Sequence, residues 1–335
     1  MYRSIIATLA TTALLMFGAG ANAQAQAQQG SIKAVYTAGP FGAYHTLFCS
    51  ALLIELEKGK FSGYACTPSG GSPDNIAKVL ADPRSIGLAQ IDVFARWSLD
   101  NAAAAKSLVV VRTLACEGLF MVTQSKDMMT TSYAQVVGLA HHLKFAVADG
   151  GSRASFEFLQ KIDPKGIGRA RNIAIVENAT AVIDQVAAGN AAVGFFVQFA
   201  DPSNANIRLL QIRALRALPV VSPELVAASV GNTPVYQVRT FSLTERGIFQ
   251  GASKVTTACT PAVIITGAPD AIADPKAADE QRAMISRIQA APDAAFLPNG
   301  RFAELIADTT PVTGPALNAM LWTYDADRKK AETGQ

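Results

Sequence analysis

Strands and helices alternate along this chain from residue 31 onward, and this alternation constrains the fold more than any other feature of the sequence. Short apolar runs typical of strands are separated by segments whose apolar residues recur at the i, i+3 and i+4 spacing of a helix. The predicted strands are 32–37, 64–67, 86–91, 108–112, 119–123, 144–148, 173–176, 193–198 and 255–266; the predicted helices are 44–57, 72–81, 152–162, 179–188, one around Met284, Ile285 and Ile288, and one that begins at Pro315. This order predicts parallel sheets with right-handed crossovers, and therefore an α/β fold.

The chain is long enough for two domains and too apolar to be a disordered polyelectrolyte. It has 335 residues, of which 50% are hydrophobic and only 16% are charged. A domain of about 150 residues gives an expectation of roughly two. The formal net charge of +3 is too small to suggest a nucleic-acid partner, so we expect none.

The first 23 residues have the pattern of a secretory signal peptide. Arg3 supplies the positive charge, residues 5–17 are an uncharged apolar run, and Ala21-Asn22-Ala23 is a small-x-small cleavage pattern. A membrane anchor is the less favoured alternative, because the apolar run is shorter than the ~20 residues that a spanning helix needs. We therefore expect cleavage after Ala23, export, and a periplasmic location.

Four cysteines in an exported chain favour disulfide bonds. Three connectivities are possible, and the predicted elements favour Cys49–Cys66, on a helix and the strand after it, with Cys116–Cys259, both in strand-like segments. The rival interpretation is a zinc site. No two cysteines have the C-x2–4-C spacing of such a site, and the three histidines lie elsewhere, so we predict no metal.

The sequence 150–154, Gly-Gly-Ser-Arg-Ala, approaches the G-x-S-x-G nucleophile elbow of hydrolases. That fold places its histidine after the serine, whereas His45, His141 and His142 all precede Ser152. The Gly-rich turns also lack the Gly-Lys-Ser/Thr and G-x-G-x-x-G patterns of nucleotide-binding loops. We therefore predict no enzyme activity and no cofactor, and an exported enzyme is the less favoured alternative.

The triplet Gly-Gly-Ser occurs twice, at 70–72 and at 150–152, each time between a predicted strand and the helix that follows it. Open α/β sheets bind ligands beyond the carboxyl ends of their strands, so two such edges that face each other would form a cleft. The backbone N–H groups at a helix start favour an anion, and glycine lets it approach the backbone. The recurrence of the turn predicts a binding site for a small anionic solute, a carboxylate or an amino acid.

The residues around these turns are the predicted ligand contacts. In this interpretation Arg153 clamps a carboxylate with two hydrogen bonds, and Asp92 pairs with an ammonium group. Taken singly, each serine is explained somewhat better as an ordinary helix cap and Arg153 as a solvated side chain, and Asp92 is explained equally well as a helix N-cap. The full set is Tyr44, Ser72, Asn75, Gln90 and Asp92 from the first lobe, with Ser152, Arg153 and Gln198 from the second.

Several of these motifs, taken in order, resemble a known family. They are Thr37-Ala38-Gly39-Pro40-Phe41-Gly42-Ala43-Tyr44-His45, Gly71-Ser72-Pro73-Asp74-Asn75, Ile86-Gly87-Leu88-Ala89-Gln90-Ile91-Asp92 and Gly151-Ser152. They are similar to the first-strand turn, the Gly-Ser-x-x-Asn turn, the Gln-x-Asp strand end and the second-lobe Gly-Ser turn of TAXI-family solute-binding proteins of TRAP transporters. The ordered match covers most of residues 31–270.

The resemblance implies a type II periplasmic-binding-protein fold, in which two α/β lobes joined by two crossing segments hold a ligand between them. Lobe 1 would comprise residues 31–121 and 252–335, and lobe 2 residues 122–251, with Cys116 and Cys259 on or beside the crossings. The implied function is delivery of the solute to integral-membrane transporter subunits by a monomer. An ABC permease or a sensing receptor is the alternative partner.

Overall fold

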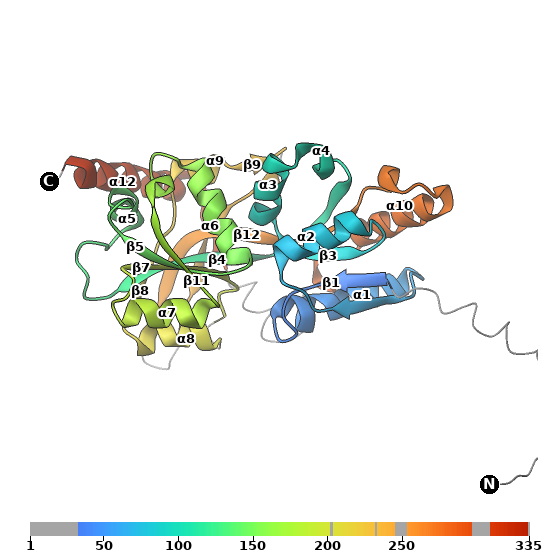
Figure 1. Ribbon diagram of the computed structural model, residues 1–335, viewed down its shortest axis with the longest axis horizontal. Coiled ribbons are helices and arrows are strands. Elements are labelled where there is room, and N and C mark those ends of the chain that lie inside the picture. Colours follow the sequence, from blue (N-terminus) through green and yellow to red (C-terminus); the bar gives the residue numbers. More distant parts are fainter. Residues whose placement is uncertain (1–32, 202–203, 232, 245–252, 297–308, 334–335) are drawn as a thin grey trace, which may run out of the picture. The chain divides into compact units, whose positions relative to one another are not determined.

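The computed structural model describes residues 33–201, 204–231, 233–244, 253–296 and 309–333 (Figure 1). The predicted signal peptide and its cleavage site lie outside these residues. Among the described helices, none has both the length and the apolar character required to cross a membrane.

One mixed sheet of eleven described strands is the centre of the fold. Its main order is β2 (Tyr64–Thr67), β1 (Lys33–Tyr36), β3 (Ile86–Gln90), β12 (Lys254–Gly267), β4 (Leu108–Gln124), β7 (Val193–Gln198), β5 (Lys144–Ala148) and β6 (Asn172–Val176). Beside this path, β8 (Leu215–Leu218) pairs with β4, and β11 (Gln237–Ser242) pairs with β12 and with β13 (Thr310–Pro311). The separate pair of β9 (Ser229–Val230) and β10 (Thr233–Pro234) is antiparallel.

The sheet consists of two halves with the same strand pattern. In lobe 1, β2, β1 and β3 are parallel, and β12 lies antiparallel beside β3. In lobe 2, β6, β5 and β7 are parallel, and β4 lies antiparallel beside β7. Each lobe is thus a small α/β sheet completed by a strand from the crossing pair. This pattern confirms the predicted two-lobed α/β fold of the type II periplasmic-binding-protein class.

The two long strands β4 and β12 belong to both lobes. Residues 108–118 of β4 pair with β12, and residues 118–122 pair with β7 of lobe 2. In the same way, residues 254–259 of β12 pair with β11, and residues 262–266 pair with β3 of lobe 1. The lobes are therefore joined by one antiparallel ladder, whose register shifts between Pro261 and Val263 and again between Ile264 and Ile265.

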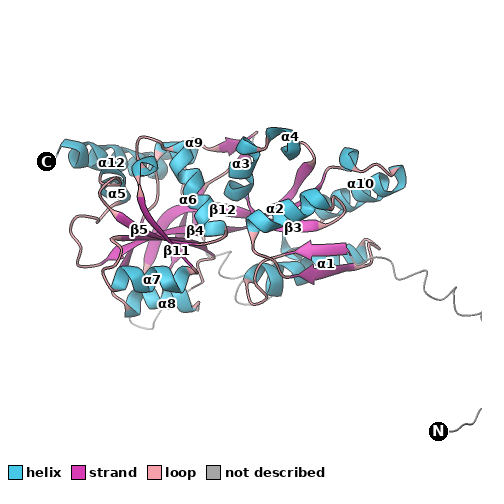
Figure 2. Ribbon diagram, in the orientation of Figure 1, coloured by secondary structure: helices cyan, strands magenta, loops and turns pink. Residues whose placement is uncertain are grey.

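Helices cover both faces of each half-sheet (Figure 2). In lobe 1 these are η1 (Tyr44–Phe48), α1 (Cys49–Lys58), α2 (Ser72–Ala81), α3 (Ile91–Asp100), α4 (Ala102–Ala105), η3 (Pro269–Ala271), α10 (Pro275–Ala290) and η4 (Asp293–Ala295). In lobe 2 they are α5 (Tyr133–Gly138), α6 (Gly151–Ile162), η2 (Ile167–Arg169), α7 (Ala179–Ala187), α8 (Ala205–Ile212) and α9 (Pro223–Ala227). Within lobe 2, α5 and α6 pack on one face and α7 and α8 on the other.

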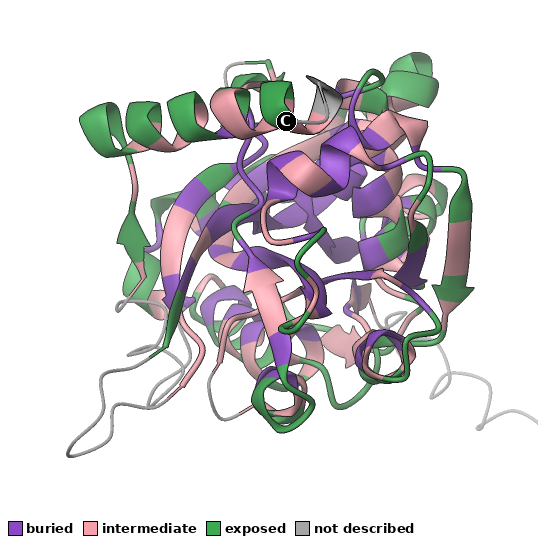
Figure 3. Cartoon of the chain, turned by 90° about the vertical axis from the view of Figure 1, so that its left-hand side faces the viewer, coloured by how far each residue is buried: buried purple, intermediate pink, exposed green. Residues whose placement is uncertain are grey.

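The last helix, α12 (Gly314–Thr333), packs on lobe 2, whereas the sequence assigned all of residues 252–335 to lobe 1. The Tyr324 ring stacks on Tyr133 of α5 with centroids 5.8 Å apart. A Cβ at Gly138 would overlap Ala331, so the two helices approach closely there. Figure 3 shows that α12, which ends at the C label, is exposed along much of its length. The apolar residues of this helix predicted a helix, but they do not say which lobe it packs on.

Two further elements differ from the sequence prediction. The segments 108–112 and 119–123 are parts of one strand, β4, because polar residues interrupt its apolar run without breaking its pairing. Helix α3 follows β3 directly at Ile91 and was not predicted, since no glycine or proline separates the two elements. Asp92 is therefore in the first turn of a helix and not at the free end of a strand.

The structure contains the disulfides Cys49–Cys66 and Cys116–Cys259, the pairing that the predicted elements favour. The first bridges helix α1 and strand β2 within lobe 1. The second joins β4 to β12 next to the point where both strands change lobes. It therefore clamps the connection between the lobes.

We predict that loss of the Cys116–Cys259 bridge destabilises the protein more than loss of Cys49–Cys66. The two bridges span 143 and 17 residues. Loop-closure entropy in the unfolded chain then gives about 5 and about 3 kcal/mol respectively. Urea unfolding of the paired Cys→Ala variants under non-oxidising, non-reducing conditions measures both losses. Equal losses, or the reverse order, would contradict the larger stabilisation expected from the Cys116–Cys259 bridge.

Candidate functional site

Each Gly-Gly-Ser turn places one glycine with positive φ directly before a helix, the second glycine in the first triplet and the first glycine in the second triplet. Gly71 precedes α2 with φ +92°, and Gly150 precedes α6 with φ +71°. Both values lie in the left-handed region that favours glycine, because a Cβ would clash with the backbone there. Each turn thus needs a glycine at the residue that precedes its helix.

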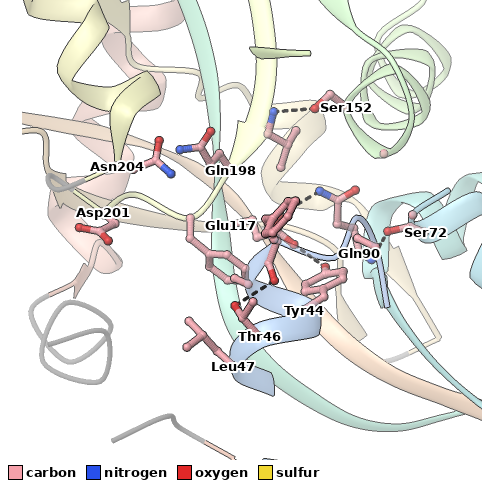
Figure 4. A pocket seen from close by; sticks show the side chains of 18 of the residues that line it. Tyr44, Thr46, Leu47, Ser72, Gln90, Glu117, Ser152, Gln198, Asp201 and Asn204 are labelled. Atoms are coloured by element: carbon pink, nitrogen blue, oxygen red, sulfur yellow. Dashed lines mark hydrogen bonds between the residues drawn. The ribbon is translucent and has the colours of Figure 1, made fainter. Parts of the chain in front are cut away.

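Each serine ties its helix start to the third parallel strand of its own lobe. The backbone N–H of Gln90 donates to Ser72 Oγ at 3.1 Å, and the N–H of Val197 donates to Ser152 Oγ at 2.9 Å. Gln90 is the last residue of β3, and Val197 is the penultimate residue of β7, so the two contacts are similar (Figure 4). The serine oxygens accept these bonds, and the Ser72 hydroxyl also bonds to Tyr44.

The two turns face each other across the lobes. A Cβ at Gly150 would lie 3.8 Å from the carbonyl oxygen of Gly70, and a Cβ at Gly151 would overlap Oε1 of Gln90. Glycine at residue 151 therefore leaves the space that the Gln90 side chain of lobe 1 occupies. The helix starts of α2 and α6 thus converge on one place, as predicted.

A cavity of about 480 Å³ lies between these helix starts. Both turns line it, Gly71 and Ser72 from lobe 1 and Gly151 and Ser152 from lobe 2. Five of the eight predicted ligand contacts are in its lining: Tyr44, Ser72, Gln90, Ser152 and Gln198. Its size is that of a pocket for a small molecule.

Asn75 and Asp92 are buried behind this lining and have structural partners. Asn75 Nδ2 donates to the carbonyl oxygens of Thr37 and, at 2.6 Å, of Leu88. Asp92 accepts hydrogen bonds from Tyr236 Oη at 3.1 Å and from the N–H of Val93 at 2.8 Å. Asn75 thus connects the end of β1 to β3. Asp92 is a buried carboxyl in the first turn of α3.

Arg153 also lies outside the cavity lining. Its side chain is about half exposed, and Nε donates to Glu157 Oε1 at 3.0 Å, one helical turn further on. Asp149 lies 3.9 Å away on the other side. The guanidinium is therefore held along the surface of α6 by its own neighbours, and the structure does not aim it at the cavity.

The sequence analysis missed Glu117, which lies among the predicted contacts. Glu117 is on β4 and is 7% exposed; Tyr44 Oη donates to its Oε1, and Gln90 Nε2 donates to its Oε2 at 3.3 Å (Figure 4). The available signal was the single charged residue within the otherwise apolar stretch 114–122. A charge in the interior of a strand is costly unless it is paired or functional.

Burial changes the ionisation of this group. Removal from water raises the pKa of Glu117 to about 7, an effect to which the nearby Asp92 charge adds and which the bonds from Tyr44 and Gln90 oppose. Burial likewise raises the pKa of Asp92 to about 6. Asp149 and Asp201 also line the cavity. No lysine or arginine is part of the lining that the structure describes, although Arg153 Nη1 lies 3.9 Å from Asp149.

The described residues hold no group of three or more histidine, cysteine, aspartate or glutamate side chains that is arranged to bind a metal ion.

Comparison with known proteins gives structural matches only. No protein-family model matches the chain, and no curated protein sequence matches it. Similar solved structures include a TctC solute-binding protein from Polaromonas (12% identity, 91% of this chain and 98% of that chain, TM-score 0.47) and an adipate-bound R. palustris protein (12%, 91% and 97%, 0.46). A binding component of an ABC phosphonate transporter from Pseudomonas aeruginosa also matches (12%, 91% and 97%, 0.40). The fold assignment rests on the strand order described above.

We predict that Glu117→Gln flattens the pH dependence of stability. The folded carboxyl holds its proton up to about pH 7, whereas the unfolded one releases it near 4.5. The folded state thus binds more protons between these values, and the free energy of unfolding of the wild type falls as pH rises through this window. Urea midpoints from pH 4.5 to 8 should fall less in the variant, with Asp92 and Asp163, whose pKa values burial also raises, contributing to the remaining slope. An unchanged slope would contradict the burial effect on Glu117.

Proposed function

We propose that this protein is an extracytoplasmic solute-binding protein that captures a small carboxylate-bearing solute and delivers it to a membrane transporter. The observation that carries the proposal is the convergence of both Gly-Gly-Ser helix starts on one cavity between the lobes. A cavity placed between two lobes lets a ligand bridge them, and closure of the lobes then buries it. No covalent step is part of this function, and it uses no cofactor.

The backbone supplies the groups for a carboxylate. Helices α2 and α6 are 10 and 12 residues long, and their first turns have N–H groups with no intrahelical acceptor. The helix dipoles add partial positive charge at the same ends. Because Arg153 points away, the carboxylate would be held by backbone N–H groups and by the Ser152 hydroxyl.

The cavity wall also suits an organic solute. Tyr44 is buried against Phe48 and Phe199, with ring centroids 6.3 and 6.2 Å from its own. Phe199 lines the cavity, and the neighbouring Phe41 does so with an almost fully exposed side chain. Aromatic walls with a few polar groups are typical of small-molecule sites.

The partner belongs to the proposal as well. The motif resemblance to TAXI-family proteins favours a TRAP-type transporter, and the signal-peptide pattern favours the periplasm as the place of action. We expect the protein to act as a monomer, with its two lobes contacting the integral-membrane subunits.

Thermal-shift screening of the purified protein against carboxylates and amino acids tests the binding function. We expect at least one compound to raise the Tm by several degrees, since a ligand at 100 times its Kd contributes about 2.7 kcal/mol. If no compound raises the Tm while circular dichroism shows an intact fold, the proposal is contradicted.

Gly151→Ala should weaken binding of the best compound roughly tenfold or more, because the new methyl group displaces the Gln90 side chain between the lobes. Gly39→Ala is the matched control: a Cβ there meets open space, and the residue does not line the cavity. Isothermal titration of both variants measures the difference. Equal affinities for the two variants would show that the close approach of the lobes at residue 151 does not matter for binding.

A further inference from the structure

We infer that Glu117 selects solutes that carry a protonated amine, so that the ligand of this cavity is an amino-bearing carboxylate and not a simple carboxylate. This inference rests on the proposed solute-binding function and assigns a specificity-determining residue to it. Three features of the described residues support it: the charge of the cavity lining, the unfilled bonding capacity of Glu117, and an unpartnered acceptor beside it.

The charge of the lining favours a cationic group. Glu117, Asp149 and Asp201 line the cavity, and among the described residues no lysine or arginine does. Asp149 has a cation nearby, since Arg153 Nη1 lies 3.9 Å from its Oδ1. Among the described residues, Glu117 accepts hydrogen bonds only from the neutral donors Tyr44 and Gln90. Glu117 is therefore the lining carboxylate that a cationic group of a solute would balance. Only the backbone of the helix starts attracts an anion, so one end of the cavity remains suited to positive charge.

Glu117 has bonding capacity left for a ligand. A carboxylate can accept about four hydrogen bonds, and Glu117 accepts one on each oxygen, from Tyr44 Oη and from Gln90 Nε2. Both donors are neutral, so neither balances the charge of the carboxylate. The side chain is 7% exposed and lines the cavity, so a bound solute can reach it.

Gln90 provides an independent observation. Its side chain is 5% exposed and lines the cavity, and its Oε1 is buried without a hydrogen-bond partner among the described residues. The bond from Nε2 to Glu117 fixes Oε1 as the acceptor that remains. A buried acceptor without a donor is costly, and an ammonium group bound at Glu117 would supply the missing hydrogen.

The opposite requirement is found at Gln198. Its Oε1 accepts from Asn206 Nδ2 at 2.9 Å, and its Nε2 is buried with no acceptor among the described residues. Gln198 lines the cavity beside Asn204, apart from the Glu117–Gln90–Tyr44 group (Figure 4). An unused donor on one side and unused acceptors on the other match a solute with a carboxylate and an ammonium group.

Proton release is an additional readout. Tyr44 of η1, Asp92 of α3 and the lining residues Asp149 and Asp201 are the titratable groups around Glu117. Because burial holds the pKa of Glu117 near 7, a bound ammonium group lowers that pKa and expels the proton at neutral pH. Amino-acid affinity should therefore rise from pH 6 to pH 8.

Isothermal titration with matched ligands tests the inference. The probes are L-leucine and L-phenylalanine, each with its deaminated partner, 4-methylpentanoate and 3-phenylpropanoate, followed by the other amino acids and their partners. We expect the best amino acid to bind roughly 10- to 100-fold tighter than its deaminated partner, the range of a charge-assisted hydrogen bond. Deaminated compounds that bind as tightly would overturn the inference while leaving the binding function intact; absence of binding by every compound would overturn both.

Glu117→Gln provides the residue-level test. It should weaken amino-acid binding roughly tenfold or more, leave the deaminated partner within about threefold, and abolish the rise in affinity from pH 6 to pH 8. Glu157→Gln is the matched control, since it removes the same charge from the exposed surface of α6. Equal loss for both ligands would overturn the inference. If Glu117→Gln does not fold, the wild-type ligand pairs and their pH dependence decide the question.

Discussion

The antiparallel pairing of β4 with β12 is the constraint on which the rest of this structure depends. Each strand supplies the antiparallel neighbour of a three-stranded parallel sheet, β4 in lobe 2 and β12 in lobe 1. The pairing thus fixes where the carboxyl ends of both parallel sheets lie, and with them the starts of α2 and α6. The Cys116–Cys259 bridge is located where the strands pass from one lobe to the other. Without this ladder, the two helix starts would have no common cavity.

Strand alternation on β4 links the covalent clamp to the binding chemistry. Successive side chains of a strand point to opposite faces, so Cys116 bonds β12 while Glu117 lines the cavity. Thr260 is the β12 partner of Glu117, and its Oγ1 accepts from the N–H of Asp92 at 3.3 Å. Tyr44 and Gln90 then bond Glu117 from lobe 1. The buried Glu117 carboxyl is thus held by neutral donors, so no side chain that bonds it neutralises its charge, and a cationic group of a solute can do so.

The sequence indicated the parts of the site that depend on local backbone. The Gly-Gly-Ser turns were recognisable because positive φ and a helix start need those residues, and Cys49–Cys66 followed from adjacent elements. Asn75, Asp92 and Arg153 are not in the cavity lining, because the first two bond buried neighbours from other elements and the third bonds within its own helix. Asn75 holds Thr37 and Leu88, and Arg153 pairs within α6. Glu117 was missed because its partners Tyr44 and Gln90 are 73 and 27 residues away in the sequence, and no local pattern brings them together.

The central claim is that one solute contacts both helix starts and the Glu117 side chain in the cavity lining. A crystal structure of the protein with its tightest-binding amino acid tests this most directly. The account predicts the solute carboxylate within hydrogen-bond distance of backbone N–H groups in the first turns of α2 or α6, and its ammonium group at Glu117. A solute bound elsewhere, or one that contacts a single lobe with its ammonium group away from Glu117, would contradict it.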